Sequence, residues 1–214
     1  MPAAQPFPFA DRRAAGRALA AHLAPLAGAV DLVLALPRGG VPVGYEVARA
    51  LGLPLDVLVV RKLGLPGHEE LAMGAIALGG VVVRNEEVIA AEGVSEATVA
   101  AVVARERVEL QRRERAYRGE RPAPRLAGER VLLVDDGIAT GSTMVAAIRA
   151  LRAAEVAWLG AAVPVAPYAA CAALDEISDA TYCLHSPEPF RAVGLWYDDF
   201  RQTSDGEVRA LLAR

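Results

Sequence analysis

The sequence predicts an α/β protein with a mostly parallel central sheet and helices on both of its faces. Short aliphatic segments, typical of buried strands, recur along the chain, and amphipathic segments separate them. Several of the aliphatic segments run directly into glycine-rich or charged turns, which is where open α/β sheets bind ligands. With 214 residues, of which 54% are hydrophobic and 23% charged, the chain is long enough to bury a full core. We therefore expect one domain over residues 1–214.

The first half of the chain predicts helices and strands around one charged loop. Residues 10–26 place leucines on one side and arginines on the other, which favours a helix. After it we expect a strand, a helix and a second strand, at 31–37, 41–52 and 55–60. Residues 61–71 combine glycines, a proline and charges, and are expected to form an exposed loop. Two strands joined at Gly79-Gly80 follow at 73–84.

The second half predicts a long helix followed by alternating strands and helices. Ser95 is a suitable N-cap for a charged helix over 95–120. Its glutamates and arginines alternate, which favours a solvated face over a nucleic-acid patch. The remaining elements are expected at 131–134 (strand), about 142 onward (helix), 156–163 (strand), 167–175 (helix), 179–184 (strand) and after Ser204 (helix).

Composition and residue usage exclude several classes of protein. A net charge of −3 and a pI of about 5.7 give no support for binding nucleic acid. Residues 156–174 lack charge, but their prolines and Gly160 favour a strand, a turn and a helix over a membrane span. No targeting segment is visible at the N-terminus, so we expect a cytoplasmic protein. Cys171 and Cys183 are too few for a disulfide framework, and reduced thiols are expected.

The segment "VLLVDDGIATGSTM", residues 131–144, carries the most specific functional signal. An aliphatic strand runs into Asp135 and Asp136, and a small, hydroxyl-rich turn opens the next helix. The first N–H groups of that helix, at 140–143, together with the helix dipole, would form an anion site, although an ordinary N-capping turn uses the same residues. The carboxylates would repel a bare phosphate but suit hydroxyls and a metal. The segment therefore predicts a sugar-phosphate site, and it lacks the lysine of a nucleotide P-loop.

This segment closely resembles the phosphoribosyl-pyrophosphate (PRPP) motif of type I phosphoribosyltransferases. The resemblance implies that Asp135 and Asp136 hold the ribose 2- and 3-hydroxyls. It places the 5-phosphate on Ala139, Thr140, Gly141, Ser142 and Thr143. It also implies the type I phosphoribosyltransferase fold, with a core at about 10–184, a small C-terminal hood at about 185–203 and a C-terminal helix. The resemblance spans nearly the whole chain and points to a subfamily usually described only in general terms, as phosphoribosyltransferases.

Two earlier segments resemble further parts of that family's site. "LPRGG" (36–40) is similar to the pyrophosphate loop, which implies roles for Arg38, Gly39 and Gly40 and a cis peptide at Pro37–Arg38. "VRKLGLPGHEELAMGA" (60–75) is similar to the flexible loop that closes over the site, with Arg61 and Lys62 at its base facing the pyrophosphate. Lys62 is also the only lysine among 23 basic residues, which independently favours a specific role over a chance surface lysine.

The segment "PEPFRAVGLWYDDF" (187–200) gathers aromatic residues beside two acids. It resembles the variable hood of purine phosphoribosyltransferases, which implies that Phe190 or Trp196 stacks on the acceptor base. Asp198 or Asp199 would assist with pyrophosphate and metal. An aromatic cluster that anchors the C-terminal helix is the alternative interpretation. Ala139 departs from the family, because many purine enzymes carry an acid at that position, so a purine acceptor does not follow.

The resemblance implies a pentosyltransferase of nucleotide or nucleoside metabolism. It would transfer the 5-phosphoribosyl group from PRPP to a nitrogenous acceptor, in the first place a nucleobase, and release pyrophosphate. The expected catalytic set is Asp135, Asp136, Lys62 and Arg38, with Mg²⁺ bound through PRPP and contacted only indirectly by the two aspartates. A homodimer is expected from the habit of the family. A PRPP sensor without turnover and an interaction protein with a decayed site are the alternatives, and the acceptor stays open.

Overall fold

The computed structural model describes residues 8–213, and a five-stranded parallel sheet forms its centre. The strand order is β2-β1-β6-β7-β8. The strands are β1 (Leu32–Ala35), β2 (Leu55–Val57), β6 (Arg130–Val134), β7 (Trp158–Val165) and β8 (Ala180–His185). This arrangement confirms the fold class predicted from the alternating aliphatic segments.

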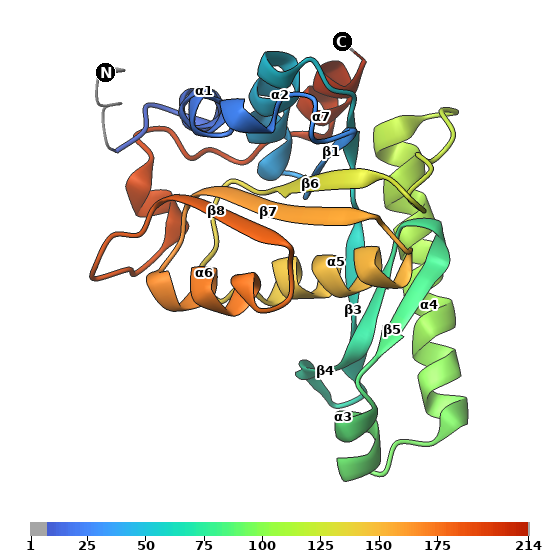
Figure 1. Ribbon diagram of the computed structural model, residues 1–214. Coiled ribbons are helices and arrows are strands. Elements are labelled where there is room, and N and C mark those ends of the chain that lie inside the picture. Colours follow the sequence, from blue (N-terminus) through green and yellow to red (C-terminus); the bar gives the residue numbers. More distant parts are fainter. Residues whose placement is uncertain (1–7, 214) are drawn as a thin grey trace.

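Helices cover both faces of this sheet (Figure 1). One face carries α1 (Arg12–His22), α2 (Gly40–Leu51) and α7 (Asp205–Leu212), and the other carries α5 (Ser142–Ala153) and α6 (Tyr168–Asp175). Successive residues of the central strands therefore enter different cores: Val33 packs with α1 and α2, whereas Leu34 packs with α5. Burial on both faces explains why β1 reads as an unbroken aliphatic run.

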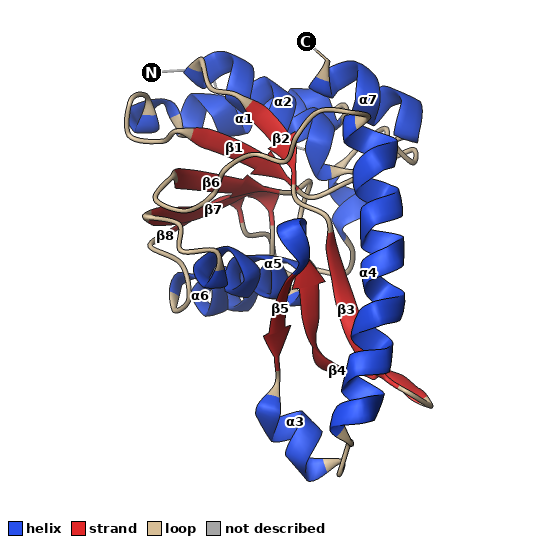
Figure 2. Ribbon diagram, turned by 90° about the vertical axis from the view of Figure 1, so that its right-hand side faces the viewer, coloured by secondary structure: helices blue, strands red, loops and turns tan. Residues whose placement is uncertain are grey.

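A second, antiparallel sheet projects from one end of the parallel sheet beside a long helix (Figure 2). It consists of β3 (Val60–Leu65), β4 (His68–Ala77) and β5 (Val81–Arg84), and it lies along α4 (Glu96–Arg118). The predicted connection at Gly79-Gly80 is confirmed, and both glycines have positive φ. Ser95 caps α4 as expected, accepting a hydrogen bond from the Thr98 N–H.

The exposed loop expected at 61–71 is wrong, because most of it forms β3 and β4. The two strands meet in a tight turn at Pro66-Gly67. Leu63 and Leu65 are buried while Lys62 and the turn are exposed, so the segment has the alternation of a strand. The glycines and charged residues of this segment obscure the alternation of buried and exposed residues in the sequence. The short helix α3 (Glu86–Ala91), capped by Asn85, was also missed, since six residues carry little periodicity.

The segment after β8 returns across the sheet edge to the N-terminal part of the chain. It contains a 3₁₀ turn at Val193–Trp196, and Phe9 and Tyr197 form a parallel β-bridge. The expectation of two reduced thiols is contradicted, because Cys171 on α6 and Cys183 on β8 form a disulfide with their Cα atoms 6.4 Å apart. Packing of α6 against β8 brings these residues together, which their spacing alone does not reveal. Across 8–213, no helix combines the length and apolar character needed to cross a membrane.

Candidate functional site

Two loops at the carboxyl ends of β1 and β6 pack directly on each other. A Cβ atom at Gly39 would lie 2.0 Å from Asp136 Oδ2, and one at Gly40 would lie 2.9 Å from the Asp135 Cα. Only glycine fits at such distances, so these residues let the β1 loop approach the acidic pair. The cis peptide expected at Pro37–Arg38 is present. The loop 36–40 thus lies beside the carboxylates, as its position at a strand end predicts.

The turn between β6 and α5 presents backbone N–H groups at the N-terminus of α5. Gly141, with a φ of 74°, is the N-cap of α5, and no side chain caps the helix. Within residues 8–213, no acceptor takes the backbone N–H groups of 140–143. Thr140, Ser142 and Thr143 line a cavity of ≈ 120 Å³ together with Asp135. Backbone donors without acceptors, on residues that line a small cavity at a helix N-terminus, favour anion binding over simple capping.

Asp135 and Asp136 are partly buried neighbours with different surroundings. The Asp136 carboxylate accepts a hydrogen bond of 2.6 Å from Arg12 Nε, and the Tyr197 hydroxyl donates to the Asp136 carbonyl oxygen. Asp135 Oδ1 accepts a bond of 2.8 Å from the Asp136 N–H. Burial raises the pKa of the Asp135 carboxyl well above its ordinary value, and the charge of Asp136 adds to this. Burial also raises the pKa of Asp136, although Arg12 opposes the shift.

The two carboxylates also face different cavities. Asp135 lines the cavity of the Gly141 turn, whereas Asp136 lines a larger cavity of ≈ 540 Å³. Four arginines surround the larger cavity, namely Arg12, Arg38, Arg112 and Arg113. Arg38 reaches Asp205 at 3.4 Å across it. A molecule with an anion at each end and hydroxyls between them would match these two cavities and the carboxylates that separate them.

The sequence did not predict a place in the site for three of these arginines. Arg112 and Arg113 lie on α4 and pair with Glu109 at 2.7 and 2.8 Å, which is the alternation interpreted as a solvated face. Arg12 belongs to the charged side of α1, but it turns toward the site. Its guanidinium bonds Asp136, donates to the Arg201 carbonyl oxygen at 2.7 Å and lies 3.9 Å from the centre of the Phe200 ring. The partners of Arg12 come from distant segments, and so do the residues that share the cavity with Arg112 and Arg113. No local pattern in the sequence therefore places these three arginines in the site.

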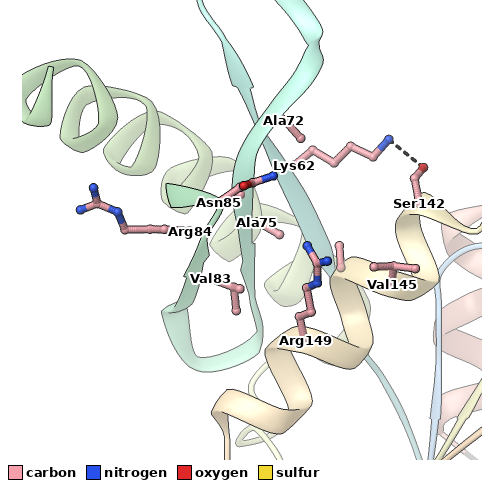
Figure 3. A pocket seen from close by; sticks show the side chains of 11 residues that line it. Lys62, Ala72, Ala75, Val83, Arg84, Asn85, Ser142, Val145 and Arg149 are labelled. Atoms are coloured by element: carbon pink, nitrogen blue, oxygen red, sulfur yellow. Dashed lines mark hydrogen bonds between the residues drawn. The ribbon is translucent and has the colours of Figure 1, made fainter. Parts of the chain in front are cut away.

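Of the two basic residues expected at the base of the flexible loop, the structure brings Lys62 to the site. The Lys62 ammonium donates to Ser142 Oγ at 2.9 Å, which joins β3 to the Gly141 turn (Figure 3). Arg61 points to the opposite face of the strand and donates twice to Glu106 on α4, at 2.9 and 2.7 Å. Burial alone would raise the pKa of Glu106, but hydrogen bonds from Arg61 and Arg105 outweigh it and lower that pKa.

The hood residues pack mainly with one another. The rings of Phe190 and Trp196 have centroids 6.2 Å apart, and both pack against a cluster that includes Phe9 and Tyr197. Hydrogen bonds from Arg201 lower the pKa of Asp199 to about 2, and the Asp198 N–H donates to the Phe9 carbonyl oxygen. The two cavities beside the acidic pair are lined by none of these four predicted acceptor residues: Phe190, Trp196, Asp198 and Asp199.

Comparison with known proteins places the chain among phosphoribosyl transferases. The family model described as "Phosphoribosyl transferase domain" matches residues 11–186. The Mycobacterium tuberculosis H37Rv protein named "Putative phosphoribosyl transferase Rv0571c" is 48% identical over 206 residues, covering 96% of this chain and 46% of that protein. The chain thus spans about half the length of this curated relative. The crystal structure of the protein TT1426 from Thermus thermophilus has a TM-score of 0.86 and 42% identity, covering 95% of this chain and 97% of that one.

Proposed function

We propose that this chain, which belongs to the phosphoribosyl transferase family, transfers the 5-phosphoribosyl group of PRPP to a nitrogenous acceptor and releases pyrophosphate. The observation that carries the proposal is the turn before α5, whose N–H groups at 140–143 have no acceptor within residues 8–213 and open into a cavity shared with Asp135. An anion site beside a buried carboxylate suits a phosphate joined to a sugar.

The two cavities would hold different parts of the PRPP molecule. The 5-phosphate would bind Ala139 to Thr143, and the ribose hydroxyls would bind the carboxylates of Asp135 and Asp136. The pyrophosphate would then lie in the cavity of ≈ 540 Å³, near Arg38, Gly39 and Gly40. Arg12 fixes the orientation of Asp136 through their bond of 2.6 Å, so the carboxylate is preorganised for a ribose hydroxyl.

The proposed reaction breaks the bond between ribose C1 and pyrophosphate through an oxocarbenium-like transition state. Negative charge grows on the leaving group, and the acceptor nitrogen forms the new bond from the opposite face of the sugar. Arg38 would stabilise that charge, together with Lys62 when the hairpin moves it from Ser142. Arg61 would first have to break its hydrogen bonds to Glu106 before it could reach the pyrophosphate. We therefore propose that Lys62 and Arg38 stabilise the charge of the leaving group. Asp135 and Asp136 would orient the ribose more than transfer protons.

We propose that Mg²⁺ binds at this site only together with PRPP. Within residues 8–213, no three His, Cys, Asp or Glu side chains form a group that could hold a metal. Mg²⁺ is commonly bound mainly by substrate phosphates and water, so we propose that it arrives bound to PRPP and that Asp135 and Asp136 contact it only indirectly. When bound it would supply charge neutralisation at the leaving pyrophosphate.

The acceptor would enter beside the hood, where Phe190 or Trp196 could stack on a base and Asp198 or Asp199 could assist once the segment rearranges. We propose a cytoplasmic homodimer that acts on small molecules and binds neither nucleic acid nor membrane. A PRPP sensor without turnover is the second candidate. It is favoured by the packing of Phe190 and Trp196 into their own cluster, which leaves both rings engaged within the protein.

A nucleobase screen separates the two candidates. Each base would be incubated with the protein, PRPP and Mg²⁺, and pyrophosphate release would be measured, while calorimetry measures PRPP binding alone. Release that depends on one base establishes the transferase. PRPP binding without release by any base would establish the sensor, and the absence of PRPP binding would contradict both.

A further inference from the structure

A further cavity, of ≈ 260 Å³, lies between the antiparallel sheet and α5 (Figure 3). Strands β3, β4 and β5 line one side of it, and the first two turns of α5 line the other. Only Lys62 and Ser142 among its lining residues belong to the proposed transferase site. The cavity therefore adjoins the Gly141 turn without being part of the space proposed for PRPP.

Small side chains make this hollow. Its apolar walls come from Ala72, Ala75, Val83, Val145 and Ala146. Gly74 completes the wall, and a Cβ atom there would lie 2.1 Å from the Val83 carbonyl oxygen, so the pairing of β4 with β5 keeps this position small. The space suits a compact apolar body and excludes a large one.

The charged groups around the hollow are all positive. Lys62, Arg84 and Arg149 line it, and no Asp or Glu does. Arg84 is neutralised by Glu86 and Glu96, at 2.8 and 2.6 Å. Arg149 makes no ion pair or hydrogen bond through its guanidinium with any residue of 8–213, and Lys62 bonds only the neutral hydroxyl of Ser142. Two cations without a nearby counter-charge at the mouth of an apolar hollow favour an anionic occupant.

We propose that this cavity binds a small organic anion, with a compact apolar body against the alanines and one phosphate or carboxylate between Arg149 and Lys62. An ammonium bonds an anion more strongly than a neutral hydroxyl, so the occupant would draw Lys62 away from Ser142. Occupancy would thereby hold Lys62 away from the PRPP site and lower turnover. This regulatory consequence rests on the proposed function, whereas the binding itself does not.

Binding of phenyl phosphate tests the site, because this probe has one apolar ring and one phosphate. Inorganic phosphate serves as the comparison, since it has no body to fill the hollow and should bind only within the proposed PRPP site, at the Gly141 turn and in the cavity surrounded by four arginines. Calorimetry on the wild-type chain should resolve one more site for phenyl phosphate than for inorganic phosphate. Arg149→Gln should weaken the additional phenyl phosphate site by about tenfold or more and leave inorganic phosphate unchanged.

Three further variants sharpen the test. Ala146→Leu fills the hollow and should remove the same site. Thr143→Glu places a carboxylate at the Gly141 turn, so it should remove the inorganic phosphate bound at that turn and spare the cavity between the antiparallel sheet and α5. Arg152→Gln is the matched control on the same helix, because Arg152 pairs with Asp179 instead, at 2.9 Å. The proposal would be overturned if phenyl phosphate showed no site beyond those of inorganic phosphate, or if its additional site vanished with Thr143→Glu and survived Arg149→Gln. None of these measurements requires turnover. A result that contradicts binding in this cavity can therefore be told apart from a result that contradicts the proposed transferase activity.

Discussion

The turn after β6 and the segment after β8 leave the same end of the sheet but use their polar groups in opposite ways. The turn at 139–143 keeps the N–H groups of 140–143 free of acceptors within 8–213, and they open into a cavity. The segment 186–204 is engaged with itself and with the N-terminal part of the chain through Phe9, Tyr197 and Arg12. Under the proposed function, the difference means that the phosphate end of the site would be preformed, whereas the acceptor end would have to rearrange.

The largest expected effect comes from the acidic pair that joins the two regions. Asp135→Asn together with Asp136→Asn should weaken PRPP binding by a few kcal/mol, since each charge-assisted hydrogen bond contributes about 1.5–3 kcal/mol. The fold should survive, because asparagine has nearly the same shape. Calorimetry with PRPP measures the effect, and circular dichroism checks folding. Unchanged affinity in a folded double variant would rule out the carboxylates as ribose ligands.

A slightly smaller effect is expected at Lys62, which belongs to the phosphate end but should act in the transition state. Lys62→Ala should lower kcat and kcat/KM together by ~10²–10³-fold if it removes one preorganised donor to the leaving group. Lys62→Arg should recover only part of this, because a planar guanidinium cannot replace a compact ammonium. Steady-state kinetics with the acceptor found in the screen give both constants. A wild-type kcat with a raised KM for PRPP would show ground-state binding instead.

Arg12 links the two regions, because it donates hydrogen bonds to Asp136 and to the Arg201 carbonyl oxygen in the hood segment. Arg12→Ala should weaken PRPP binding by about tenfold through loss of one charge-assisted hydrogen bond to the carboxylate. Arg17→Ala is the matched control, since Arg17 lies on the same helix, its side chain is 54% exposed, and its one ion pair within residues 8–213 is with Glu46, at 3.8 Å. Equal PRPP affinities in the two variants would show that Arg12 has no part in orienting Asp136.

The smallest expected effect concerns stability. Burial holds the pKa of Asp135 above its value in the unfolded chain, so the folded state resists ionisation. Stability should therefore fall as pH rises from about 4, where the unfolded carboxyl ionises, toward the higher folded pKa. Asp135→Asn should lose this dependence and melt at a higher temperature at neutral pH, by about 2–4 °C per kcal/mol recovered. Thermal melts across pH 4–8 without ligand measure it, and parallel curves for the two proteins would refute the assignment.

Local patterns predicted the parallel sheet and the residues of the Gly141 turn. Both depend on short segments: aliphatic runs buried on two faces, and a strand that meets two carboxylates and a helix N-terminus. The cis peptide at Pro37–Arg38 was also expected, but only through resemblance to a family. The comparisons and the structure agree with the family and the fold class that these patterns predicted.

What the sequence could not show depends on contacts between distant segments. Arg12 and Asp136 lie 124 residues apart, and the arginines of α4 looked like a solvated helix face until the fold placed them beside Arg38. Arg61 and Lys62 are adjacent in sequence, but the strand turns them to opposite faces, and this required β3 to be recognised as a strand. The disulfide between Cys171 and Cys183 likewise follows from the packing of α6 on β8.

A crystal structure of the chain grown with ribose 5-phosphate would show whether the turn at 139–143 holds a phosphate. We expect the phosphate to accept hydrogen bonds from the N–H groups of Thr140 to Thr143 and the ribose hydroxyls to contact Asp135 or Asp136. A phosphate bound elsewhere, with those N–H groups taken by acceptors within the protein, would contradict this expectation.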